Sequence, residues 1–177
     1  ELAAHPRVRA IGETGLDFFR TDAEGQPAQY RSFEAHIALA KKHGIAMQIH
    51  DRDAHDEVLR LLESVGAPEK TVFHCFSGDA EMARIAADRG YYLSFAGNIT
   101  FKNAQNLRDA LAVTPGERIL VETDAPFLTP VPHRGRPNAP YLVPITLRFM
   151  AAELGVSVDE LAAQVAANTL EVYGTFA

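Results

Sequence analysis

The stretch Ile45-Ala46-Met47-Gln48-Ile49-His50 decides the fold, because it is a short and nearly continuous apolar run that stands between two stretches of helical pattern. A run that is apolar throughout, rather than at alternate positions, is typical of a strand covered on both faces, as in parallel sheets. Four further runs of this kind occur along the chain. They are residues 8–13, 71–74, 91–96 and 118–122.

Stretches with helical spacing separate these runs. The first ends at Gly44, a residue type that is common at helix C-caps. Five strands that alternate with helices predict parallel βαβ units and therefore an α/β fold. The apolar stripes of the four helices are Tyr30, Phe33, Ile37 and Ala40; Val58, Leu59, Leu62 and Val65; Met82, Ile85 and Ala86 before Gly90; and Leu107 with Leu111.

The pattern changes after the fifth run. Residues 125–144 hold six prolines, at Pro126, Pro130, Pro132, Pro137, Pro140 and Pro144, which predicts a long ordered loop. Two helices are expected to follow, and the second begins with a capping box from Ser157 to Glu160. The length of 177 residues predicts a single domain over residues 1–177.

Composition narrows the class of protein. The chain is 47% hydrophobic and 23% charged, as ordinary globular proteins are, and no run of 18 apolar residues predicts a membrane span. The single cysteine, Cys75, fits a reducing compartment, so we expect a cytoplasmic protein. A net charge of −6 argues against a broad nucleic-acid-coating surface, but it is compatible with one local phosphodiester site at which bound cations supply positive charge.

Acidic and imidazole side chains fall at the ends of the predicted strands. Glu13, His50 and His74 end the first three strands, and Asp124 lies just past the fifth. The carboxyl ends of parallel strands open onto one face, so we expect these four residues to meet there. Imidazole with carboxylate suits Zn²⁺, Mn²⁺ or Mg²⁺. The alternatives are hydrogen-bonded structural histidines, and acidic residues that cap the following helices.

Cations are expected near the same face. Arg52 comes two residues after His50, and Arg134 lies in the segment His133-Arg134-Gly135-Arg136 of the proline-rich loop. Guanidinium groups match the oxygens of a phosphodiester bidentately, so both arginines are candidate substrate-binding residues. A solvated basic loop, or ion pairs with Asp51, Asp53 or Glu122, are the alternatives that the spacing leaves open.

Several segments together resemble the TatD family of metal-dependent deoxyribonucleases, a branch of the amidohydrolase-like TIM barrels. The resemblance covers essentially the whole chain in order, and the combination of segments is highly specific. The segments are Ile11-Gly12-Glu13-Thr14-Gly15-Leu16-Asp17, Ile49-His50-Asp51-Arg52-Asp53-Ala54, Phe73-His74-Cys75-Phe76-Ser77-Gly78, Val121-Glu122-Thr123-Asp124-Ala125-Pro126-Phe127-Leu128, Pro132-His133-Arg134-Gly135, Asn138-Ala139-Pro140, and Asn168 with Tyr173-Gly174.

The resemblance implies a (β/α)8 barrel that hydrolyses DNA, from an end of the strand, with two divalent metal ions. It implies that Glu13 bridges the two ions, that His50 and His74 bind one of them, and that Asp124 binds the other. Asp124 is then placed as general base toward a metal-bound water, so Asp124 and Glu13 are the expected catalytic residues. Phosphate contact is the expected role of Arg52 and Arg134. DNA is the expected substrate, and we expect neither a membrane nor an obligate protein partner.

The chain departs from the family at one point. The family opens with a strand bearing D-x-H-x-H, and no His-x-His occurs in this sequence. A closed barrel also needs eight strands and about 250 residues, so we expect about five C-terminal βα units of a longer protein, with the first three units missing. Two other functions remain open: hydrolysis of another ester or an amide, and an inactive barrel fragment.

Overall fold

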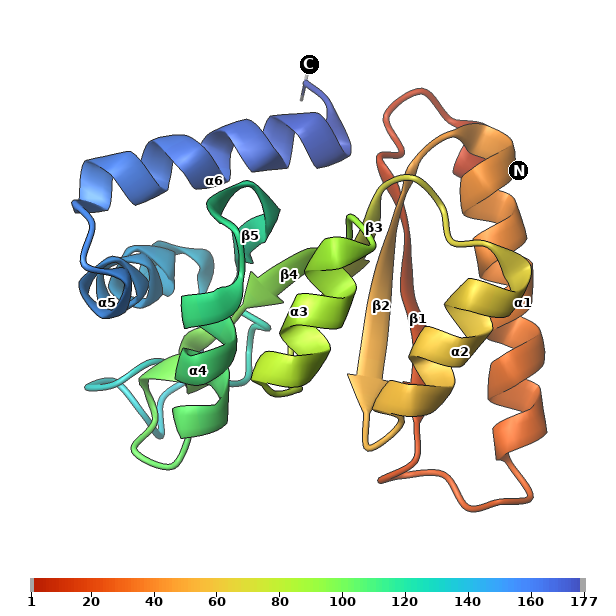
Figure 1. Ribbon diagram of the computed structural model, residues 1–177, viewed down its shortest axis with the longest axis horizontal. Helices are drawn as coiled ribbons and strands as arrows, with labels where there is room; N and C mark the ends of the chain where they lie inside the picture. The colour runs from red at the N-terminus through yellow and green to blue at the C-terminus, as the bar shows by residue number, and fades with distance from the viewer. Residues whose placement is uncertain (1, 176–177) are drawn as a thin grey trace. The chain divides into compact units, whose positions relative to one another are not determined.

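The computed structural model describes residues 2–175, which form two compact units. The first unit comprises Glu1–His74 together with Leu170–Ala177, and the second comprises Cys75–Thr169. The boundary falls directly after the third strand. Each unit is described by itself, with the element labels of Figure 1.

Three parallel strands form the sheet of the first unit, and β2 pairs with β1 on one side and with β3 on the other. α1 packs against β1, and α2 contacts both β1 and β2 (Figure 1). The elements are η1 (Leu2–Ala4), β1 (Ala10–Asp17), α1 (Gln26–His43), β2 (Ala46–Arg52), α2 (His55–Val65) and β3 (Thr71–Phe73).

The core of the first unit follows from the apolar runs and stripes of its sequence. Phe33 and Ile37 on α1 are buried, as are Met47 and Ile49 on β2. Complete burial of such a side chain contributes about 1.5–3 kcal/mol. The chain leaves α1 through Gly44, which adopts the left-handed conformation that a side chain disfavours, as expected of a C-cap.

The second unit contains a pair of parallel strands, in which Leu93 pairs with Ile119 and Phe95 with Val121. α3 packs against α4, and α5 contacts α4 and β5. The elements are α3 (Ala80–Asp88), β4 (Tyr92–Phe95), η2 (Gly97–Thr100), α4 (Gln105–Val113), η3 (Gly116–Arg118), β5 (Ile119–Val121), η4 (Pro140–Leu142), α5 (Val143–Leu154) and α6 (Val158–Tyr173), of which residues from Leu170 onward belong to the first unit.

The five predicted strands, the four helices between them and the two final helices are confirmed, and so is the proline-rich loop. The ends of the elements differ from the prediction. β1 continues four residues past Glu13, to Asp17, and β2 continues past His50 to Arg52. Val65, expected on the buried stripe of α2, is 37% exposed, because it is the last residue of that helix.

No single helix among the described residues is long and apolar enough to cross a bilayer, and the segments 140–154 and 158–173 reach that length and composition only as a pair bent by 112°.

Candidate metal centre

Glu13 lies at an irregularity of the β1–β2 pairing. Ile11 pairs with Met47 and Thr14 pairs with Ile49, so that Gly12 and Glu13 together face the single residue Gln48. An extra residue of this kind interrupts the ladder and redirects the side chain that it carries. The exposed side chain of Glu13 therefore projects from the strand between two regularly paired segments.

His50 and His74 come from the neighbouring strands. His50 pairs in register with Gly15 of β1, where an added Cβ would lie 2.0 Å from the carbonyl oxygen of His50, so the two backbones approach as closely as they do only because residue 15 is glycine. His74 follows β3 directly, and its backbone N–H donates to the carbonyl of Ile49 at 3.0 Å. This bond extends the β2–β3 ladder by one residue and fixes the backbone position from which the imidazole of His74 extends.

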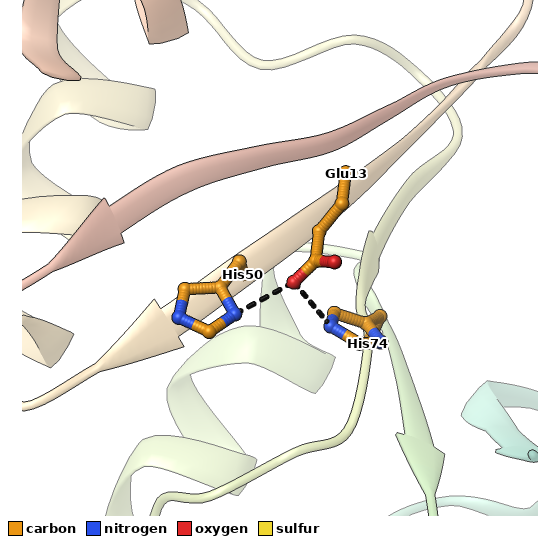
Figure 2. Close-up of side chains that lie close together, drawn as sticks. All are labelled: Glu13, His50 and His74. Atoms are coloured by element: carbon orange, nitrogen blue, oxygen red, sulfur yellow. Dashed lines mark hydrogen bonds and ion pairs between the residues drawn. The ribbon is translucent and has the colours of Figure 1, made fainter. Parts of the chain in front are cut away.

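The three side chains converge on one carboxylate oxygen (Figure 2). Glu13 Oε1 lies 2.7 Å from His50 Nδ1 and 2.9 Å from His74 Nε2. One ligand atom from each residue lies within 4.8 Å of those of the other two. Two imidazole nitrogens and a carboxylate oxygen are a donor set that Zn²⁺, Mn²⁺ and related ions accept, so these residues fit a divalent metal ion.

The electrostatics of the cluster favour an ionised carboxylate. Burial would raise the pKa of Glu13, but the charge and hydrogen bond of His74, followed by those of His50, outweigh it and hold the pKa below its ordinary value of 4.5. Glu13 is 53% exposed, so solvent screens these interactions in part. The carboxylate is thus in the form that binds cations.

Asp17, four residues after Glu13, also contacts the cluster. Its Oδ2 lies 3.1 Å from His50 Nε2, and its Oδ1 accepts the backbone N–H of Arg20 at 2.8 Å. Burial would raise its pKa, but the bond from Arg20, the contact with His50 and the charge of Arg52 lower it below 3.8. Residues 13, 15 and 17 share one face of β1, so alternation along a strand would have identified Asp17 had β1 been predicted to extend this far.

Asp124 belongs to the second unit. It lies three residues past the end of β5, is partly buried, and has a φ of 57°. Its carbonyl accepts the N–H of Phe127 at 2.9 Å, and the side chain of Asn138 donates to the carbonyls of Thr123 and Phe127, each at 2.7 Å. The structure thus brings Glu13, His50 and His74 together, and it holds Asp124 in a braced loop of the other unit.

The alternative roles of the acidic residues do not apply. α1 begins at Gln26 and its N-cap is Gly25, so Glu13 does not cap that helix. The first helical turn after Asp124 is η4, whose N-cap is Ala139. Neither residue therefore holds its place by capping the element that follows it.

Both candidate phosphate-binding arginines stack on aromatic rings of their own units. The guanidinium carbon of Arg52 lies 3.8 Å from the centre of the Phe19 ring. Arg134, in the proline-rich loop, lies 4.0 Å from the centre of the Phe101 ring. Stacking of this kind restrains the guanidinium plane and leaves its N–H donors at the edge.

Comparison with known proteins gives a consistent result. The sequence model of the family described as TatD-related DNase matches residues 1–174. The uncharacterized metal-dependent hydrolase TatD of Mycobacterium tuberculosis is 45% identical over 177 residues, which are 98% of this chain and 67% of that protein. The uncharacterized metal-dependent hydrolase YcfH of Escherichia coli K12 is 44% identical over 162 residues, 91% of this chain and 61% of that protein. The chain thus spans about two thirds of the length of these relatives.

Solved structures agree on the fold. YjjV, a TatD homologue from Escherichia coli K12, superposes with a TM-score of 0.89 at 30% identity, over 95% of this chain and 64% of that one. A TatD-family hydrolase from Entamoeba histolytica superposes with a TM-score of 0.79 at 24% identity, over the same shares of the two chains, which is evidence for the fold alone. The fold is therefore the α/β barrel type of these proteins, and the chain belongs to the TatD-related DNase family.

Proposed function

We propose that the protein is a divalent-metal-dependent hydrolase that cleaves phosphodiester bonds of DNA from an end of the strand. The observation that carries the proposal is the convergence of Glu13, His50 and His74 from three neighbouring parallel strands. His50 lies two residues before the end of β2 and His74 directly after β3, toward the carboxyl ends of the strands, where sites in barrels are assembled. The names of the relatives, metal-dependent hydrolases, and of the family, TatD-related DNase, support the reaction class and the substrate respectively.

Each residue has a separate role in the proposed reaction. Glu13, His50 and His74 would hold the metal, and Asp124 of the second unit is proposed as a further ligand and as the general base that takes a proton from the attacking water. Bound divalent ions lower the pKa of that water and stabilise charge on the phosphoryl oxygens. Both imidazoles contact Oε1 of Glu13, so the second carboxylate oxygen takes part in neither contact. The proposal of a second ion rests on the resemblance to the family.

Arg52 and Arg134 are proposed to bind the phosphates of the DNA. Arg52 lies on the same face of β2 as His50, because residues two apart on a strand share a face. Its stacking on Phe19 orients the guanidinium before a substrate arrives, which reduces the entropy lost on binding. Arg134 is restrained in the same way by Phe101.

The test is cleavage of end-labelled single- and double-stranded DNA by the full-length protein with Mg²⁺, Mn²⁺ or Zn²⁺. Glu13→Gln keeps the size of the side chain and removes its charge, and we expect it to lower kcat by 10²-fold or more; the matched control Glu24→Gln changes an exposed loop residue and should have no effect. Undiminished cleavage by Glu13→Gln, or in excess chelator, would overturn the proposal.

Hydrolysis of another ester or of an amide is the alternative. A metal-binding cluster on a barrel does not by itself select a substrate. The same preparation is therefore assayed on phosphomonoesters, carboxylic esters and amides. Metal-dependent turnover of one of these, without cleavage of DNA, would retain the metal centre and replace the substrate.

A further inference from the structure

His50 lies between two carboxylates, one at each ring nitrogen. Nδ1 is 2.7 Å from Glu13 Oε1, and Nε2 is 3.1 Å from Asp17 Oδ2. A neutral imidazole carries a single N–H, so it can donate to only one of the two. The other nitrogen then directs a lone pair at a carboxylate, which is repulsive unless a cation lies between them or the ring is protonated.

The carboxylate of Asp17 is fixed independently of His50. Its Oδ1 accepts the N–H of Arg20 at 2.8 Å. The side chain of Gln29 makes two hydrogen bonds to the backbone of Asp17: it accepts from the N–H at 3.0 Å and donates to the carbonyl at 3.3 Å. Asp17 also pairs in register with Arg52 of β2. The carboxylate of Asp17 is thus held in place by contacts other than the one to His50.

Glu13 differs from Asp17, because its Oε1 contacts a second imidazole nitrogen, Nε2 of His74, at 2.9 Å. A metal ion placed among Glu13, His50 and His74 would take the lone pair of His50 Nδ1 and remove the repulsion there. The single N–H of His50 would then reside on Nε2, where Asp17 accepts it. The two contacts of the ring are therefore compatible with one protonation pattern once the metal is bound.

We propose that Asp17 is the positioning residue of His50: it accepts the Nε2–H hydrogen bond and so presents Nδ1 to the metal in the correct tautomer and orientation. Asp17 acts through His50 and does not itself bind the metal. The inference rests on the metal centre of the proposed function, but it is independent of the substrate.

The first measurement is metal affinity, by competition with a chromophoric chelator, on the full-length protein. Removing an outer hydrogen-bond partner of a metal-bound histidine costs 10- to 100-fold in affinity. We expect that loss in Asp17→Ala and a smaller one in Asp17→Asn, whose amide oxygen still accepts from Nε2–H. Asp22→Asn is the matched control, since its side chain accepts only the nearby N–H of Gly25 among the hydrogen bonds described for it, and its affinity should be unchanged.

The second measurement is the tautomer of His50, read from two-bond ¹H–¹⁵N correlations in the zinc-loaded protein. We expect a proton on Nε2 in the wild type. In Asp17→Ala the expected result is loss of the single tautomer, or a shift to Nδ1–H with metal on Nε2, changes that a purely structural defect would not produce. A wild-type ring protonated at Nδ1, or a folded Asp17→Ala with wild-type affinity, would overturn the inference.

Failure of this inference and failure of the proposed function give different results. If Glu13→Gln also binds metal normally, the metal centre itself is wrong. If Asp17 controls affinity and tautomer but DNA is not cleaved, the inference holds and the substrate is wrong. Should Asp17→Ala not fold, as judged by circular dichroism, the tautomer of the wild type and the affinity of Asp17→Asn decide the question.

Discussion

Some single side chains in this molecule form hydrogen bonds with backbone groups that are far away in the sequence. Asn168 on α6 is 2% exposed, and its amide donates to the carbonyl of Gly116 at 2.8 Å and to that of Ile119 at 2.7 Å. Its oxygen accepts from Gln164 at 2.8 Å. One residue thus satisfies two backbone acceptors just before and at the start of β5, the strand that leads to Asp124. Asn168 stands in a segment of the family resemblance, and this bracing is a physical reason for its place there.

Replacement of Asn168 by alanine should be costly. The variant leaves the buried carbonyl of Ile119 without the amide that donates to it, and an unsatisfied buried group costs about 1–3 kcal/mol, whereas the carbonyl of the exposed Gly116 keeps the N–H of Ile119. We expect the free energy of unfolding to fall by about 1–3 kcal/mol, measured by urea denaturation of the full-length protein. The control Glu171→Ala lies on the exposed side of the same helix and should change stability by less than about 0.5 kcal/mol. A loss below about 1 kcal/mol for Asn168→Ala would show that water replaces the amide.

The sequence predicts only some of the residues that meet in the candidate metal centre. The ends of the apolar runs predict that Glu13, His50, His74 and Asp124 meet, and in the structure the first three lie together. Asp17 was not singled out, because the apolar run stops at Glu13 and gives no sign that β1 continues. The residues that follow, Thr14-Gly15-Leu16-Asp17, are not an apolar run, although they pair regularly with β2 as far as Arg52.

Some helices and strands are positioned where the backbone of one segment lies very close to the backbone of another. Gly97 begins η2, and a Cβ added there would lie 2.1 Å from the carbonyl oxygen of Leu128. That contact is to backbone rather than to a flexible side chain, so the loop would have to move. Gly116 begins η3, a second short 3₁₀ helix of the same unit, and there the nearest atom is 3.7 Å away, in the side chain of Gln164.

The two glycines therefore predict opposite outcomes for the same substitution. Gly97→Ala should destabilise the protein by about 2 kcal/mol or more, because the clash displaces the loop that follows β5. Gly116→Ala should be neutral or stabilising by up to about 1 kcal/mol, because it restricts the unfolded chain without a clash. Thermal unfolding of both variants checks the pair. Equal effects of the two substitutions on stability would mean that the backbone of Leu128 moves aside without a cost in free energy.

The start of α6 predicts a pH dependence. The predicted capping box is present: Ser157 Oγ accepts the N–H of Glu160 at 3.2 Å, and Glu160 Oε2 accepts the N–H of Ser157 at 2.9 Å and its hydroxyl at 2.8 Å. The backbone N–H of Ser157, followed by its hydroxyl, lowers the pKa of Glu160 below its ordinary value of 4.5. A lowered folded-state pKa stabilises the protein above 4.5, and that contribution is lost as the pH falls through the folded-state value.

Comparison of the wild type with Glu160→Gln by urea denaturation, between pH 7 and pH 3, checks the sign. The wild type should be the more stable of the two at pH 7, and the difference should shrink below pH 4.5. A difference that is constant over this range would mean that the charge of Glu160 contributes nothing. Ser157→Ala, which removes the N-cap itself, should cost about 1 kcal/mol at pH 7 and less at pH 3, because its hydroxyl also donates to the ionised carboxylate of Glu160.

The fold class of the whole molecule was easier to predict than the limits of its elements. Continuous apolar runs separated by helical stripes require buried parallel strands, and that requirement does not depend on where each strand ends. The prediction of a single domain over residues 1–177 rests on length alone and stays a prediction, whereas the boundary between the two compact units at His74 follows from which residues contact one another.

Metal binding should stabilise the first unit, because it holds Glu13, His50 and His74. At a free metal concentration of 100 times Kd the linkage is about 2.7 kcal/mol, which for a chain of this size raises Tm by about 5–10 °C. Hydrogen exchange should slow at the amides of β1, of β2 and around His74. If Asp124 is a ligand as proposed, the amides of residues 122–125 should be protected as well, and Asp124→Asn should reduce the rise in Tm. Glu13→Gln should abolish it; a full rise in that variant would mean that the ion binds elsewhere, and the proposed centre would have to be abandoned.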